Sequence, residues 1–195
     1  MPRLWTTTIE THRHEVRAAV VQATGQLVAE RGLKGVSMSA IAQLAGIGRA
    51  TLYRYYPDVD AILNAWHEDQ VTGHVERLLA ISEQAGPAIE RLRRVLAAYA
   101  ESRQHSSHED AADLVASLHA SQTVHHHLEQ LTRVVEGLIE TAARDGDARG
   151  DVPPAELATF ALAAMSSAAH SKSKNAISRL LAVTFDALSP RATRA

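Results

Sequence analysis

The feature that most constrains this chain is a short break at residues 46–48, Gly-Ile-Gly, between two helical patterns. The pattern before the break repeats an apolar face at three- and four-residue spacing, formed by Met38, Ile41, Ala42 and Ala45. Ser37 stands where an N-cap accepts hydrogen bonds from the first free N–H groups of a helix. Glycine tolerates the positive φ of a sharp turn, and Pro57 ends the second helical pattern, residues 49–56. The stretch 37–56 therefore predicts a helix-turn-helix.

The second helix of this motif carries side chains suited to reading DNA. Leu52 and Tyr56 are four residues apart and are expected to point into the core. Six side chains are left facing outward: Arg49, Ala50, Thr51, Tyr53, Arg54 and Tyr55. Arginine can bind guanine through two hydrogen bonds, alanine and threonine suit the thymine methyl group, and tyrosine and threonine hydroxyls suit phosphates. An αα-corner with half-buried tyrosines and solvated arginines is the alternative interpretation of the same residues.

The longer context, residues 16–63, resembles the DNA-binding domain of the TetR family of transcriptional regulators. The matching segments are AAVVQATGQLVAERG and VSMSAIAQLAGIGRATLYRYYPDVDAIL, and the most specific part is IAxxAG followed by TLYRYYP. The resemblance implies DNA contacts at Ser37, at the helix start spanning residues 48–51, and at Tyr53 and Tyr55.

Two positions depart from the family pattern. Gly48 stands in place of the usual serine, which removes a side-chain cap and phosphate donor but leaves the backbone N–H. Val59 stands where the family often has lysine, so one phosphate contact is expected to be missing. Neither change removes the resemblance.

Charge is divided unevenly along the chain, although the formal net charge is only −2. Residues 1–56 hold seven Lys or Arg and three Glu, a net charge of +4, and the remainder holds 13 basic and 19 acidic residues, a net charge of −6. A basic head on an acidic body is typical of a nucleic-acid-binding module joined to another domain, although chance asymmetry of a solvated surface gives the same pattern. We expect a DNA-binding domain at 1–57 and an effector-binding and dimerisation domain at 58–195.

Helical periodicity without strand alternation continues to the end of the chain, which predicts an all-α fold of about nine helices. Outside the helix-turn-helix, the expected helices are about 11–31, 58–84, 88–103, 109–120, 123–144, 154–169 and 172–188. Residues 1–10 lack helical periodicity and are expected to form a mobile arm, from which Arg3 or Arg13 could reach an adjacent DNA groove. A frayed tail is the plainer alternative.

The last two expected helices, within residues 153–188, have a broad apolar face. Its members are Leu157, Phe160, Ala161, Ala164, Met165 and Ala168 on the first helix, and Ile177, Leu180, Leu181, Thr184, Phe185 and Leu188 on the second. Such a face at the end of a small domain needs a covering partner. In the TetR family the two C-terminal helices pair with their copies, so the resemblance implies a homodimer; an ordinary intradomain core is the alternative.

The resemblance also implies a repressor that a small-molecule effector releases from its DNA operator. The middle helices offer apolar stripes with a few polar tips, which is the composition of a ligand site. Four residues are candidates, because each is large or polar on an inward face: Trp66, Tyr99, His119 and Met165. Each of them also fits a plain core position.

Eleven histidines raise a different possibility, an α-helical metal-binding protein or enzyme. The run His125–His127 cannot converge on one ion, because consecutive helical residues point about 100° apart. His105 and His108 are better spaced but lack a third fixed ligand. No cysteine, phosphate-binding glycine loop, HExxH or GxSxG motif is present. We therefore expect no catalytic residues, no metal and no cofactor.

No apolar run approaches the ~20 residues that span a bilayer, and the N-terminus lacks the apolar segment of a signal peptide. The sequence thus predicts a cytoplasmic, DNA-binding transcriptional regulator with no membrane partner. Its expected partners are a near-palindromic double-stranded DNA operator, a small-molecule effector and a second copy of the chain.

Overall fold

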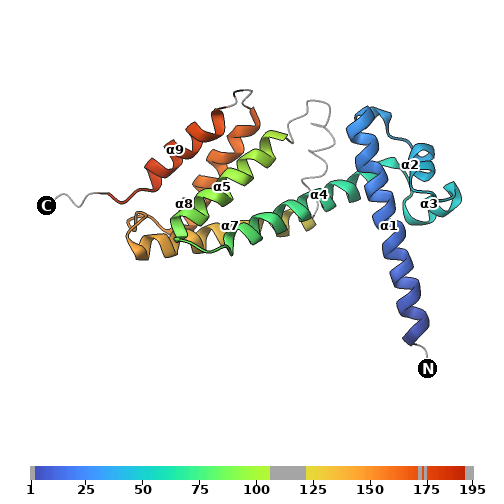
Figure 1. Ribbon diagram of the computed structural model, residues 1–195, viewed down its shortest axis with the longest axis horizontal. Helices are drawn as coiled ribbons and strands as arrows, with labels where there is room; N and C mark the ends of the chain where they lie inside the picture. Colours follow the sequence, from blue (N-terminus) through green and yellow to red (C-terminus); the bar gives the residue numbers. More distant parts are fainter. Residues whose placement is uncertain (1–2, 106–121, 171–172, 174, 192–195) are drawn as a thin grey trace. The chain divides into compact units, whose positions relative to one another are not determined.

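The computed structural model describes residues 3–105, 122–170, 173 and 175–191 (Figure 1). The chain divides into two compact units, Met1–Gln70 and Val71–Ala195. The division falls inside helix α4 (Val59–Ser82), so each unit contains one part of that helix. Every regular element among the described residues is helical, which confirms the all-α prediction.

The first unit holds α1 (Arg3–Arg31), the 3₁₀ turn η1 (Leu33–Gly35), α2 (Met38–Leu44), α3 (Arg49–Tyr55) and the start of α4. One buried cluster joins these elements and consists of Val16, Val20, Leu27, Met38, Ile41, Ala42, Leu52 and Ile62. The members from α1 recur at the spacing of one helix face, as the sequence predicts. The helix-turn-helix is thus fixed on a core that α1 and α4 supply.

The structure tests the predicted starts of two helices in the first unit, α4 and α1. Asp58, where the sequence predicts this helix to begin, caps α4, because its Oδ1 accepts a hydrogen bond of 2.8 Å from the N–H of Ala61. The expectation for residues 1–10 is wrong in part, since α1 already begins at Arg3. No Gly or Pro separates Arg3 from the strongly helical stretch that follows, and extending a helix costs far less than nucleating one.

The second unit holds the remainder of α4 and the helices α5 (Ala88–His105), α7 (Gln122–Asp145), α8 (Pro154–Ser166) and α9 (Ala176–Leu188). The turn η3 (Ser167–His170) follows α8, so the last turn of the helix expected at 154–169 is 3₁₀ rather than α. The helix expected from 172 begins at Ala176 instead. The helix expected at 109–120 lies outside the described residues.

The core of the second unit lies where α5, α7 and α8 pack together (Figure 1). Its largest fully buried side chains are Leu92, Leu96, Leu131, Ile139, Met165 and Leu188. Phe185 closes one side of this core, and the guanidinium carbon of Arg93 lies 3.9 Å from the centre of its ring. Helix α9 is therefore bound to α5 by apolar burial and by a cation–π contact.

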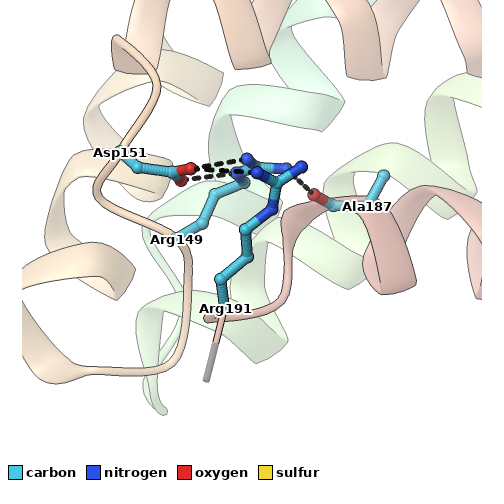
Figure 2. A network of polar contacts seen from close by, with 4 residues as sticks. All are labelled: Arg149, Asp151, Ala187 and Arg191. Atoms are coloured by element: carbon cyan, nitrogen blue, oxygen red, sulfur yellow. Dashed lines mark hydrogen bonds and ion pairs between the residues drawn. The ribbon is translucent and has the colours of Figure 1, made fainter. Parts of the chain in front are cut away.

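A polar network joins the loop after α7 to the end of α9 (Figure 2). The Arg149 guanidinium donates two hydrogen bonds of 2.7 Å to the carboxylate of Asp151 and one of 3.2 Å to the carbonyl of Ala187. The backbone N–H of Arg149 also donates to the carbonyl of Leu188, at 2.8 Å. Arg191 adds a weaker ion pair to Asp151, at 3.7 Å. Arg149 thus supplies donors to the otherwise free carbonyls at the C-terminus of α9.

This network predicts a pH-dependent contribution to stability. The hydrogen bonds from Arg149, and then the charges of Arg149 and Arg191, lower the pKa of Asp151 below its ordinary value. A lowered carboxyl pKa stabilises the folded chain at neutral pH, and this contribution is lost as the pH falls through the folded-state pKa. At pH 7, Asp151→Asn should therefore lower the Tm, and the difference from wild type should shrink below about pH 4.

Asp147→Asn, in the same loop, is the matched control, since Asp147 is exposed and only its backbone N–H takes part in the helix end. Calorimetry of the three proteins across the acid range provides the measurement. Equal Tm values for wild type and Asp151→Asn at pH 7 would contradict the assigned role.

Candidate DNA-binding surface and effector residues

The turn between α2 and α3 is a Schellman motif. Gly46 takes a φ of 69°, in the left-handed region. Its N–H donates to the carbonyl of Gln43 at 3.3 Å, and the N–H of Ile47 donates to the carbonyl of Ala42 at 3.0 Å. Both bonds use carbonyls that the end of α2 would otherwise leave free. Gly46 therefore sets the direction in which the chain leaves α2 and enters α3.

The two helix starts of the motif differ in how they are capped. The Oγ of Ser37 accepts a hydrogen bond of 3.2 Å from the N–H of Ala40, which confirms its predicted role as N-cap of α2. Gly48 is the N-cap of α3 and provides no side-chain hydrogen bond, with φ at −70° and ψ at 144°. The first N–H groups of α3 consequently have no side-chain acceptor and stay available to an anionic partner.

Helix α3 has one face in the core and one in solvent. Leu52 is fully buried, and the exposed predicted contact residues are Ser37, Gly48, Arg49, Ala50, Tyr53 and Arg54. Thr51 is half-buried. Tyr55 also differs from the expectation that it faces outward, because it is half-buried and packs against the core cluster of the first unit. Position 55 lies three residues after Leu52, which places part of its ring on the buried side of the helix.

Tyr56 lies at the C-cap of α3 and packs against the same core cluster, as its spacing from Leu52 predicts. Burial raises the pKa of its hydroxyl, an effect that the nearby charge of Arg17 partly offsets. The hydroxyl is therefore neutral at physiological pH, and Tyr56 serves to hold the end of α3.

Two arginines on α3, Arg49 and Arg54, have exposed side chains. Neither Arg49 nor Arg54 takes part in a hydrogen bond or ion pair with any residue in the described part of the chain. Tyr53 lies between them along the sequence, and its side chain is 49% exposed. Together these groups offer two cations and a phenol, which can bind base edges and phosphates.

The four predicted effector residues occupy different surroundings. In the first unit, Trp66 of α4 lies over Gly25 of α1, where a Cβ would come within 2.9 Å of the indole Nε1. In the second unit, the Tyr99 hydroxyl lies 2.9 Å from the Oγ of Ser166, the residue after the fully buried Met165. The structure thus brings Tyr99 and Met165 together on one core. His119 lies outside the described residues.

The histidines present no metal site within the ranges that the structure describes, where no three His, Asp or Glu side chains gather around one point. His125 faces Glu129 at 3.7 Å on the surface of α7, whereas the Nε2 of His127 lies 3.0 Å from the hydroxyl of Thr72 on α4. His108 and the side chain of His105 lie outside the described residues. Among the described helices, none is both long and apolar enough to cross a lipid bilayer.

Comparison with known families covers most of the chain. Residues 20–66 match the bacterial regulatory proteins of the tetR family, and residues 92–190 match the C-terminal domain of SbtR-like transcriptional regulators. The second match alone spans about half of the chain. None of the curated proteins matches in sequence.

Solved structures share the fold. A TetR/AcrR-family regulator from Thermobifida fusca has a TM-score of 0.72 at 16% identity, over 87% of this chain and 96% of that one. The TetR regulator SCO0520 from Streptomyces coelicolor has a TM-score of 0.61 at 25% identity, over 90% and 99% of the two chains. FadR from Bacillus subtilis, solved in complex with stearoyl-CoA, has a TM-score of 0.62 at 15% identity, over 88% and 97%.

The left-handed conformation of Gly46 generates a prediction for the motif. A side chain in this conformation costs about 1–2 kcal/mol, so Gly46→Ala should lower the free energy of unfolding by that amount. Gly48→Ser is the matched control, because its backbone suits any residue and a serine there can cap α3. Urea denaturation followed by circular dichroism should show a loss for the first variant and no loss for the second; equal curves would contradict the role of Gly46.

Proposed function

The chain belongs to the TetR family of transcriptional regulators, and we propose that it is a repressor whose homodimer leaves a near-palindromic operator when a small-molecule effector binds. Membership makes it a DNA-binding regulator with a C-terminal ligand-binding domain, in a family whose members are transcription factors rather than enzymes. Acting on DNA, it would work in the cytoplasm.

The observation that carries the proposal is the solvent face of α3. Arg49 and Arg54 have no partner among the residues that the structure describes, Tyr53 is exposed, and Leu52 anchors the opposite side of the helix. An exposed cation without a partner contributes nothing to folding, but it can take guanine O6 and N7 or a phosphate in a complex with DNA. We assign base contacts to Arg49, Ala50 and Thr51. We assign phosphate contacts to Tyr53, Tyr55, Arg54 and the capping positions Ser37 and Gly48.

A homodimer would raise the DNA specificity of this surface. One short helix contacts only a few base pairs, and two copies at fixed spacing multiply the specificity. The last helices offer an apolar surface for it: Phe160 on α8 is 45% exposed, and Val183 on α9 is 65% exposed. Phe185, in contrast, is buried within its own chain and packs against α5, so it serves the core. We propose that the exposed side chains between residues 153 and 188 meet their copies.

The effector site is proposed within the ligand-binding domain, on the inner face of α5 and α8 that carries Tyr99 and Met165. Trp66 and His119 remain the other candidates. FadR, which has the same fold, binds stearoyl-CoA, a ligand with a long apolar body and an anionic head. A site of this type needs apolar walls and a few polar anchors. Release from DNA then requires that the effector bind the DNA-free conformation more tightly, typically by about 1–3 kcal/mol.

The assignment of α3 predicts two kinds of DNA-binding defect. Arg49→Ala should weaken binding to the selected operator by about 1–3 kcal/mol and relax base preference, since it removes a bidentate contact. Tyr53→Phe should weaken binding to operator and scrambled DNA alike, because a phosphate contact is independent of sequence. Fluorescence anisotropy on operator fragments selected from random DNA supplies the affinities.

Arg133→Ala is the matched control for these variants, as it removes an exposed arginine of α7 outside the motif. It should bind both DNAs like the wild type. If Arg49→Ala and Tyr53→Phe also bind both DNAs like the wild type, α3 is not the DNA-recognition helix.

The proposed dimer predicts that a charge on the apolar surface of α9 separates the copies. Val183→Asp should yield a folded monomer by light scattering at micromolar concentration, because the exposed valine gives no support to its own core. Gln84→Asp adds the same charge outside α8 and α9 and should remain dimeric. A wild-type protein that is itself monomeric would exclude the interface.

A further inference from the structure

Three of the four arginines on α5 have a structural partner. Arg91 donates a hydrogen bond of 3.0 Å to the carbonyl of Ser82, and Arg94 donates one of 3.1 Å to the carbonyl of Ala85. Both bonds fasten the loop between α4 and α5. Arg93 lies over the ring of Phe185, at 3.9 Å from its centre. Each of these cations therefore contributes to the packing of the second unit.

Arg103, on the last turn of α5, is different. Its side chain is half-buried, and its Nε, like that of Arg91, is removed from solvent without a hydrogen-bond acceptor, but unlike Arg91, Arg103 has no other side-chain hydrogen bond in the described part of the chain. Within the described part of the chain, the guanidinium takes part in no ion pair with an acidic side chain. Removing a charged donor from water without a partner is unfavourable, so folding alone gives no reason for an arginine at this position.

Arg103 follows a tyrosine of α5 that packs against the core of the second unit. Tyr99 precedes it by one helical turn and lies on the same face of α5. The Oγ of Ser166 donates to the carbonyl of Leu162, at 2.9 Å, so the Tyr99 hydroxyl must donate its own proton to Ser166. The phenol oxygen consequently keeps a free lone pair. Helices α5 and α8 and the turn η3 pack together at this end of the unit (Figure 1).

We propose that the effector is an organic carboxylic acid, and that Arg103 binds its carboxylate. A carboxylate fits the geometry, because Nε–H and one Nη–H of a guanidinium form a parallel pair of donors for its two oxygens. A single guanidinium also balances the single charge of a monocarboxylate, whereas phosphate sites gather several cations or N–H groups. The free lone pair of Tyr99 would accept from a hydroxyl or amide of the same ligand. This assignment rests on the proposed effector-binding function and specifies its ligand class.

The first test needs no ligand. Because the described part of the chain gives the Arg103 guanidinium no counter-charge, Arg103→Met should raise the Tm of the unliganded chain. Arg133→Met is the matched control, since Arg133 lies exposed on α7, and its Tm should stay within about a degree of wild type. A Tm that falls in Arg103→Met would show that the guanidinium stabilises the fold, and would overturn the proposal.

The second test measures ligand class directly, on the DNA-free protein, by thermal shift and calorimetry. The probes are hexanoate, decanoate, benzoate and 4-hydroxyphenylacetate, each beside its neutral primary amide. At least one carboxylate should raise the wild-type Tm by about 5–10 °C at 100 times its Kd, and its amide should not. Arg103→Gln should lose about 10- to 100-fold in affinity, Arg103→Lys less, and Arg133→Gln nothing.

No carboxylate-specific stabilisation across this set, or an equal response in Arg103→Gln, would overturn the assignment. Because DNA is absent, these outcomes are independent of operator binding. A carboxylate response in a chain that binds no DNA would retain the site and reject the proposed repressor function.

Discussion

The complete burial of Leu52 is the contact on which the proposed DNA-binding surface depends. Helix α3 has only seven residues, too few to be stable in isolation, so its position comes from packing rather than from helix propensity. Leu52 inserts into a core built by α1, α2 and α4, and the Schellman turn at Gly46 fixes the angle of entry. These two constraints orient α3 so that solvent is the only environment left for the side chains of Arg49, Tyr53 and Arg54.

The two units handle their polar groups in opposite ways. In the first unit, Arg49 and Arg54 have no hydrogen-bond or ion-pair partner among the described residues, on the surface that we propose binds DNA. In the second, Arg149 pairs with Asp151, and Arg93 lies over the ring of Phe185. Arg103 differs from both, because its half-buried guanidinium has no ion-pair partner among the residues that the structure describes.

Much of this structure follows from local sequence rules, and the departures have physical causes. The helix-turn-helix, the caps at Ser37 and Asp58 and the buried face of α1 were all predictable, because each depends on residues within a few positions of one another. The partial burial of Tyr55 was not, since it depends on how α3 rotates against distant helices. The environment of Arg103 was not predictable for the same reason, because a basic residue at a helix end is usually exposed and only tertiary packing buries its Nε.

The contact between Trp66 and Gly25 gives the first unit an intrinsic optical label. The chain has only two tryptophans, and in a Trp5→Phe background the indole of Trp66 would be the sole source of tryptophan emission. That indole touches α1 at a position where even a methyl group would not fit. Its emission wavelength and lifetime therefore depend on whether α4 stays packed against α1. Time-resolved fluorescence can therefore report on the contact between α4 and α1 while DNA or an organic acid is added, without a chemical dye.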